Sequence, residues 1–262
     1  MQPLESMPDA TRRAIRGVLT DIDETLSTHG RLTAEAYEAM QRLHSAGKLV
    51  IPITGRPAGW CDHIARMWPV DAVVGENGAF YMRYDSTAHK LVRRFVDDEA
   101  TRRRHRDKLT AIADRIVASV PGSALASDQR YREADVAIDF CEDVPRLERP
   151  AIDRIVAMME AEGMTAKVSS IHVNGWFGTY SKLTMTKRLL SEVFAIDIDA
   201  DRETFVFVGD SPNDAPMFAY FPNAVGVANV RQFADRIPAL PAYVTQAESG
   251  AGFAELASFL LA

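Results

Sequence analysis

The chain has 262 residues, of which 47% are hydrophobic and 25% are charged, a composition typical of an ordinary globular protein. Its formal net charge of −6 argues against a general nucleic-acid-binding role, which would need a basic face. The sequence has neither an apolar N-terminal segment of signal-peptide length nor a run of about 18 apolar residues. We therefore expect a cytoplasmic protein that does not bind membranes.

An apolar run ends in two aspartates near the N-terminus. Residues 1–13 are polar, and we expect a loose tail there. Val18 and Leu19 indicate the end of a buried strand, and alternation then points Asp21 and Asp23 to the same side. Two like charges at the carboxyl end of a strand repel unless a cation or a proton-transfer role holds them together. The alternative is a helix N-cap followed by an unrelated loop acid.

The next segments alternate between helix and strand. Apolar spacing predicts a helix over 33–46, a strand over 49–53, a second helix and a third strand over 71–74. This order predicts a parallel sheet, so the fold class is α/β.

Polar residues follow the second and third strands. Thr54 offers a hydroxyl group, Gly55 permits close approach of the backbone, and Arg56 could contact a substrate. Thr54 is equally explained as a helix cap, and Arg56 as a surface ion-pair partner. Asn77 is either a substrate contact or a turn residue.

Residues 84–176 have a different pattern. We predict a helix over 96–120, a strand over 130–140, a helix beginning near residue 150, and one or two strands over 166–173. Helices on one face of a mostly antiparallel sheet describe an α+β insert. None of the motifs that carry chemistry falls in it.

The chain then returns to alternating helices and strands, ending in a helix from residue 252. Lys182 begins a helix over 182–194, where its charge opposes the helix dipole, so an anion-binding role is favoured over that of a solvated surface lysine. A strand over 204–208 runs directly into a second pair of acids, Asp210 and Asp214. Acids from two strand ends would form a hard oxygen site suited to Mg²⁺; they are Asp21, Asp23, Asp210 and Asp214.

The ordered set Asp-x-Asp-x-Thr, Thr54-Gly55-Arg56, Lys182 and Gly-Asp-x-x-Asn-Asp resembles the haloacid dehalogenase (HAD) superfamily of phosphatases. Residues 75–79, Gly-Glu-Asn-Gly-Ala, resemble a segment of its Cof-like branch with a large cap. The sequence of residues 209–217 is similar to the corresponding segment of mannosyl-3-phosphoglycerate phosphatases. The resemblance implies a Rossmann-like catalytic core and an inserted substrate-specificity cap; the expected ranges are 14–83 and 177–262 for the core and 84–176 for the cap.

The resemblance also implies roles for individual residues. Asp21 would be the nucleophile, and Asp23 the general acid and base, with its backbone carbonyl on the metal. Asp210 would be a side-chain metal ligand, and Asp214 an outer ligand or a partner of Lys182. Thr54 and Lys182 would hold the phosphate, and the remaining substrate contacts would be Gly55, Arg56, Asn77 and Asn213, with Asn213 alternatively orienting Lys182. Glu24 stands where the family usually has glycine.

We therefore expect an Mg²⁺-dependent phosphomonoester hydrolase that acts on a small phosphorylated metabolite, either a sugar phosphate or a sugar-acid phosphate. Two alternatives remain open: a phosphomutase with the same aspartyl-phosphate chemistry, and a non-catalytic sugar-phosphate-binding protein. A homodimer is compatible with the sequence.

Overall fold

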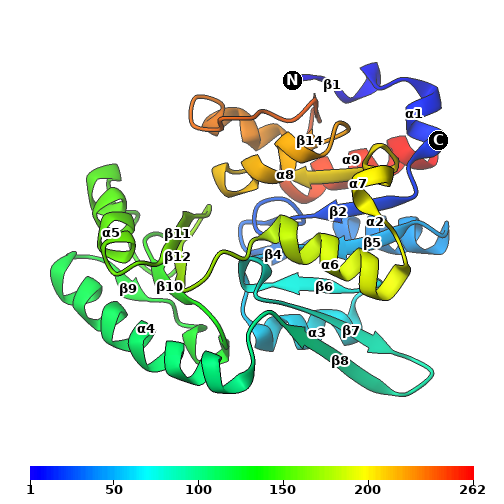
Figure 1. The fold of residues 1–262 in the computed structure, drawn as a ribbon. Coiled ribbons are helices and arrows are strands. Elements are labelled where there is room, and N and C mark those ends of the chain that lie inside the picture. The colour runs from blue at the N-terminus through cyan, green and yellow to red at the C-terminus, as the bar shows by residue number, and fades with distance from the viewer.

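The computed structural model describes residues 1–262 and contains a central parallel sheet of six strands (Figure 1). Every pairing within this sheet is parallel. In spatial order the strands are β1 (Gln2–Pro3), β15 (Tyr243–Val244), β14 (Val225–Gly226), β13 (Phe205–Gly209), β2 (Gly17–Thr20) and β5 (Leu49–Pro52). The predicted α/β class is confirmed.

Helices cover both faces of the central sheet, because alternate residues of its strands enter two different apolar clusters. Val18 and Val50 belong to the cluster on one face, and Leu19 and Ile51 to the cluster on the other. Helices α2 (Ala34–Ser45), α3 (Ala58–Met67) and α9 (Ser249–Leu261) contribute to the first cluster, and α6 (Lys182–Phe194), α7 (Ile198–Asp201) and α8 (Ala215–Tyr220) to the second. Burial on both faces explains the uninterrupted apolar character of these strands.

The predicted third strand, β6 (Val73–Gly75), joins β5 through a parallel bridge between Ile53 and Val74. It also begins a three-stranded antiparallel sheet with β7 (Phe80–Asp85) and β8 (Lys90–Phe95), a hairpin that the sequence analysis did not anticipate. The expected domain boundary at residue 84 therefore falls inside a strand.

A second sheet lies to one side of the core, in the green part of the chain (Figure 1). It is antiparallel, and its order is β11 (Thr165–Val168), β12 (His172–Trp176), β10 (Val136–Asp139) and β9 (Ala124–Leu125). Helices α4 (Glu99–Ser119) and α5 (Arg149–Ala161) share an apolar cluster with it. We call this α+β unit the cap. The predicted strand over 130–140 is much shorter in the structure, because residues 129–131 form the 3₁₀ turn η3 (Gln129–Tyr131).

The N-terminal segment is not a loose tail, so that expectation was wrong. Its strand β1 pairs with β15, and the short helix α1 (Asp9–Ala14) follows. Leu4 and Met7 are 1% and 3% exposed and belong to the main apolar cluster. Burial of two apolar side chains in an otherwise polar stretch gives too weak a periodic signal to be recognised from the sequence.

The remaining regular elements are short. The hairpin β3 (Ser27–Thr28) and β4 (Arg31–Leu32) follows the first pair of aspartates. The other 3₁₀ turns are η1 (Leu4–Ser6), η2 (Glu76–Gly78), η4 (Arg202–Thr204), η5 (Pro212–Asp214) and η6 (Ala228–Phe233). None of the helices combines the length and the apolar character that crossing a membrane would require.

Candidate active site

Asp21 lies at the carboxyl end of β2, a central strand flanked by β13 and β5. Its backbone N–H donates to the carbonyl of Val208, which continues the ladder between the two strands by one residue. The residue is 4% exposed. Burial, opposed by Lys182 and reinforced by Asp214, raises the pKa of Asp21 to about 7.

Lys182 brings the two halves of the core together at this point. Its ammonium group lies 2.9 Å from Asp21 Oδ1 and 2.8 Å from Asp214 Oδ1. Ser181 caps α6 through a reciprocal capping box with Thr184, which fixes the position of the first helical residue, Lys182. Burial alone would lower the pKa of this lysine, but the charges of both aspartates outweigh it and raise the pKa.

The turn that contains Gly78 also positions the start of α6. Gly78 has a φ of 105°, in the left-handed region that favours glycine. A Cβ atom there would lie 2.1 Å from the carbonyl oxygen of Ser181 and 2.9 Å from the backbone nitrogen of Lys182. The turn after β6 therefore packs directly on the residues that present Lys182.

Asp210 and Asp214 reach the same point from the end of β13. Asp214 Oδ2 accepts from the N–H groups of Asp210 and Ser211 at 3.2 and 3.3 Å, which holds the loop in place. Asn229 donates to Asp210 Oδ2 at 3.2 Å. Burial, followed by the charge of Asp214, raises the pKa of Asp210 well above its usual value.

Oxygen atoms of three buried carboxylates, from Asp21, Asp210 and Asp214, lie within 4.8 Å of one another. When all three are ionised, Lys182 balances only one of their charges, and two negative charges remain. A divalent cation with oxygen ligands would balance the rest, so the donor set and its charge fit Mg²⁺. The structure thus brings together Lys182 and three of the four predicted metal-binding acids.

Asp23 is placed differently. Arg56 Nε lies 2.9 and 3.1 Å from the two carboxylate oxygens of Asp23, and Arg56 Nη2 lies 2.7 Å from Oδ1. The Asp23 carboxylate therefore faces Arg56 rather than joining the three-acid cluster. The same guanidinium reaches the cap, with Asp128 at 3.4 Å and Glu142 at 2.7 Å.

Of the other predicted residues, Gly55, Arg56 and Asn213 border the cavity beside Asp21, and Thr54 and Asn77 do not. The Thr54 hydroxyl is buried and accepts from the N–H of Arg56 at 3.0 Å, as a loop cap would. Asn77 has a φ of 56° and donates to Asp135 of the cap at 3.4 Å, so it is a turn residue that also faces the cap. Asn213 Oδ1 accepts from Ser211, and Asn213 borders the same cavity as Gly55.

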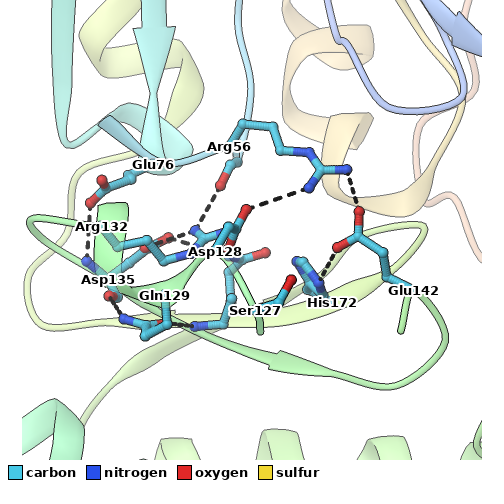
Figure 2. A network of polar contacts seen from close by, with 12 residues as sticks. Arg56, Glu76, Ser127, Asp128, Gln129, Arg132, Asp135, Glu142 and His172 are labelled. Atoms are coloured by element: carbon cyan, nitrogen blue, oxygen red, sulfur yellow. Dashed lines mark hydrogen bonds and ion pairs between the residues drawn. The ribbon is translucent and has the colours of Figure 1, made fainter. Parts of the chain in front are cut away.

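Several residues that the sequence analysis did not single out join core and cap, and Figure 2 shows them. The carboxylate of Glu76 accepts from the N–H groups of Ala58, Glu133, Ala134 and Asp135 at 2.6–3.3 Å. Arg132 of the cap has a fully buried side chain and donates to the carbonyl of Gly55 at 2.8 Å. Only Glu76 carried a sequence signal, because it stands in the Gly-Glu-Asn-Gly-Ala segment.

Glu142 and His172 complete the contact between Arg56 and the cap. His172 Nε2 lies 2.9 Å from Glu142 Oε2, and Arg56 pairs with the other carboxylate oxygen. Burial would raise the pKa of Glu142, but hydrogen bonds from His172 and Arg56 lower it to about 2. Glu142 therefore stays ionised and bridges Arg56 and His172.

The cap closes over Asp21. The cavity bordered by Asp21 and Asp23 from the core and by Arg132, His172 and Asn174 from the cap has a volume of about 10 Å³. Such a space holds about one water molecule, and a phosphate ester is far larger. A phosphate ester therefore does not fit beside Asp21 with the cap in this position.

Glu24 points away from the three acids. Its carboxylate oxygens accept from the N–H of Gly30 at 3.3 Å and from the hydroxyl of Ser249 at 3.4 Å. Its φ of 55° is the conformation for which glycine is the usual residue. The substitution thus places strain in the backbone but no additional charge among Asp21, Asp210 and Asp214.

Comparison with known proteins agrees with this geometry. A family model of haloacid dehalogenase-like hydrolases matches residues 18–108. No curated protein matches the chain by sequence.

Three solved structures share the fold over nearly the whole chain. Sucrose-phosphatase from Synechocystis, solved with sucrose and phosphate, is 18% identical, has a TM-score of 0.65, and the match covers 95% of this chain and 98% of that one. The C-terminal domain of trehalose-6-phosphate phosphatase from C. albicans is 14% identical, with a TM-score of 0.68 and coverages of 96% and 94%. A HAD/COF-like hydrolase from Plasmodium vivax is 15% identical, with a TM-score of 0.66 and coverages of 95% and 96%.

The site therefore combines a parallel α/β core, an inserted cap, and a lysine that lies between Asp21 and Asp214. Residues 18–108 of the chain are thus similar to haloacid dehalogenase-like hydrolases, and the chain as a whole shares its fold with the solved phosphatases and hydrolase named above.

Proposed function

We propose that this enzyme is an Mg²⁺-dependent phosphomonoester hydrolase that acts on a small phosphorylated metabolite, a sugar phosphate or sugar-acid phosphate, through an aspartyl-phosphate at Asp21. The observation that carries the proposal is the position of Lys182, which lies within 3 Å of both Asp21 and Asp214 while Asp210 completes the acidic cluster. A carboxylate nucleophile beside a fixed cation is the arrangement that attack on phosphorus requires.

Asp21 has one oxygen available for attack. Lys182 binds Oδ1, and Oδ2 accepts no hydrogen bond from the protein. Attack by Oδ2 forms the bond to phosphorus and expels the alcohol oxygen of the substrate. Lys182 stays next to the phosphoryl group and offsets the charge that gathers on its oxygens.

Asp23 is the group proposed to move protons. It is two residues after Asp21, and both border the closed cavity. Protonated, it would donate to the leaving oxygen; ionised, it would take a proton from the water that hydrolyses the aspartyl-phosphate. Arg56 holds both of its oxygens and so fixes the direction in which it faces.

Asp21, Asp210 and Asp214 would hold the Mg²⁺. When bound, the ion would supply positive charge that offsets the repulsion between the Asp21 carboxylate and the phosphoryl group. Burial is the main cause of the raised pKa values of Asp21 and Asp210, and the charge of Asp214 adds to it.

The cap side of the cavity favours a polar, hydroxylated substrate. Arg132, Ser169, His172 and Asn174 border it and offer hydrogen-bond groups. The named sugar-phosphate phosphatases that share the fold are in line with this choice.

The test is hydrolysis of an aryl phosphate with and without Mg²⁺ by the wild type, Asp21→Asn and the matched control Glu24→Gln. We expect Asp21→Asn to lose at least about a thousandfold in kcat, and the control to retain activity. Activity retained in Asp21→Asn would exclude the covalent route. Measuring free phosphate release separates a hydrolase from a mutase, because a mutase transfers the group without releasing it.

A further inference from the structure

A second, larger cleft lies between core and cap. It has a volume of about 840 Å³, and its walls come from α3 and β8 of the core and from α4 and the η3 turn of the cap. Of the residues that border it, only Arg132 also borders the small cavity beside Asp21. The cleft is therefore separate from the candidate active site.

Arginines dominate this cleft, which we call the arginine cleft. Six border it: Arg66, Arg93, Arg102, Arg106, Arg130 and Arg132. The acids among its lining residues are Asp62, Glu99 and Glu133, so the lining residues alone have an excess of three positive charges; Asp128 and Asp135, which do not border the cleft, also pair with Arg132. This excess is notable in a chain whose formal net charge is −6.

The acids pair with only some of these arginines. Asp62 pairs with Arg66 at 2.7 Å. Glu133 is shared between Arg93 at 2.8 Å and Arg102 at 3.5 Å. Arg102 Nε is buried and has no hydrogen-bond partner. Arg106 and Arg130 are exposed and form no ion pair.

Arg132 adds a further unused donor. Its side chain is fully buried, and it pairs with Asp128 and Asp135, yet its Nη2 has no acceptor in the protein. Buried donors in folded proteins are nearly always bonded, so a guanidinium nitrogen without an acceptor at the edge of a basic cleft is an exception.

Some of the guanidinium groups are held in fixed positions. Arg102 donates to the carbonyl of Asp97 at 2.8 Å and lies over the ring of Phe95, 3.8 Å from its centroid. Arg93 lies over the same ring at 5.5 Å. Stacking holds the plane of a guanidinium in place, so an anion meets its unused donors in a fixed orientation.

We propose that the arginine cleft is a second binding site, for a small metabolite that carries at least two phosphoryl groups. Its volume fits a ligand of metabolite size, and its charge excess needs more than one anionic group for balance. Because the walls belong to both core and cap, the bound metabolite joins the two and stabilises the closed arrangement. Arg132 connects the cleft to Gly55, beside the candidate active site.

The test is calorimetric titration of the full-length protein with inorganic pyrophosphate in metal-free buffer. Without a divalent cation, the carboxylates of Asp21, Asp210 and Asp214 repel the probe, so the measurement reports on the arginine cleft. The double variant Arg106→Gln/Arg130→Gln removes two exposed cleft charges. Its matched control, Arg104→Gln/Arg154→Gln, removes two exposed charges from the same cap outside the cleft.

We expect the cleft variant to weaken pyrophosphate binding by at least about tenfold, and the control by less than about twofold. Absence of binding by the wild type, equal binding by the cleft variant, or equal weakening in both variants would overturn the proposal. The outcome is independent of the proposed phosphatase activity, because no turnover is measured and the cleft variant leaves Asp21, Asp23 and Lys182 intact.

Discussion

Arg56 binds both carboxylate oxygens of Asp23, and its remaining nitrogens reach Asp128 and Glu142 of the cap. One side chain thus connects the proposed acid and base of the reaction to the element that closes over it. When the cap moves, Arg56 loses two of its three carboxylate partners. The position of Asp23 and the position of the cap are therefore coupled through this guanidinium.

We expect Arg56→Lys to lower kcat by about tenfold to a hundredfold, because a single ammonium group cannot hold two oxygens of Asp23 in a fork and so leaves the acid poorly positioned. Steady-state hydrolysis of an aryl phosphate measures this. Arg115→Lys, at an exposed ion pair on α4, is the control and should retain the wild-type kcat. An unchanged kcat in Arg56→Lys would mean that Asp23 needs no help from Arg56.

Gly78→Ala should damage both stability and activity. Its Cβ would meet the carbonyl of Ser181 at 2.1 Å, so the start of α6, and with it Lys182, must shift. We expect a loss of about 2–3 kcal/mol in the free energy of unfolding, measured in urea, together with a lower kcat.

Gly163→Ala is the matched control for that variant, because Gly163 also has a positive φ, of 75°, but a Cβ there would meet no atom within 4 Å. It should lose only about 1 kcal/mol of unfolding free energy from the backbone conformation, and keep its kcat. Equal effects in the two variants would show that contact with Ser181 is unimportant.

Mg²⁺ binding should release protons near pH 6. Burial raises the pKa of Asp21 to about 7, and that of Asp210 rises as well, so the metal-free site holds protons that a cation must displace. Affinity should therefore increase as the pH rises from 6 to 8. In the metal-free protein, the raised pKa values mean that the folded state binds more protons than the unfolded state. The free energy of unfolding should therefore decrease as the pH rises from about 4 to 7.

Calorimetry of Mg²⁺ binding at pH 6 in two buffers of different ionisation enthalpy counts the released protons. An affinity that does not change between pH 6 and 8 would contradict the coupling.

Glu24→Gly and Glu24→Ala together separate strain from charge. Both remove the carboxylate, whose hydrogen bonds are long, but only glycine relieves the positive φ of 55°. We expect Glu24→Gly to be more stable than Glu24→Ala by about 1 kcal/mol in urea unfolding, and both to retain kcat. A large loss of kcat in either variant would show that Glu24 takes part in the reaction.

The core of the site could be predicted because each part depends on local sequence. Asp21 and Asp210 directly follow buried apolar strands, and Lys182 begins an amphipathic helix at the position that the structure shows. Parallel topology then brings the carboxyl ends of these strands to one edge. The meeting of Asp21, Asp210 and Lys182 follows from these two facts alone.

The contacts between the core and the cap could not be predicted from local sequence. Glu76 meets the backbone of Glu133–Asp135, and Arg56 meets Glu142, across long stretches of chain. The hydrophobic periodicity of a sequence does not indicate which surface of an inserted domain packs against the domain that contains it. In the sequence, nothing distinguishes Glu142 from an ordinary surface acid. Only the folded structure shows that Arg56 and His172 lie beside it.

The water-sized space above Asp21 has a consequence for how tightly any metabolite is held. Only protein molecules whose cap is displaced can bind a metabolite. The apparent affinity therefore equals the intrinsic affinity multiplied by the fraction of protein molecules with an open cap. If roughly one molecule in a hundred were open, binding would look roughly a hundredfold weaker than the contacts themselves. A high KM would then reflect the equilibrium between closed and open cap positions rather than weak contacts with the substrate. A variant in which the cap opens more often would bind the substrate more tightly without gaining a contact.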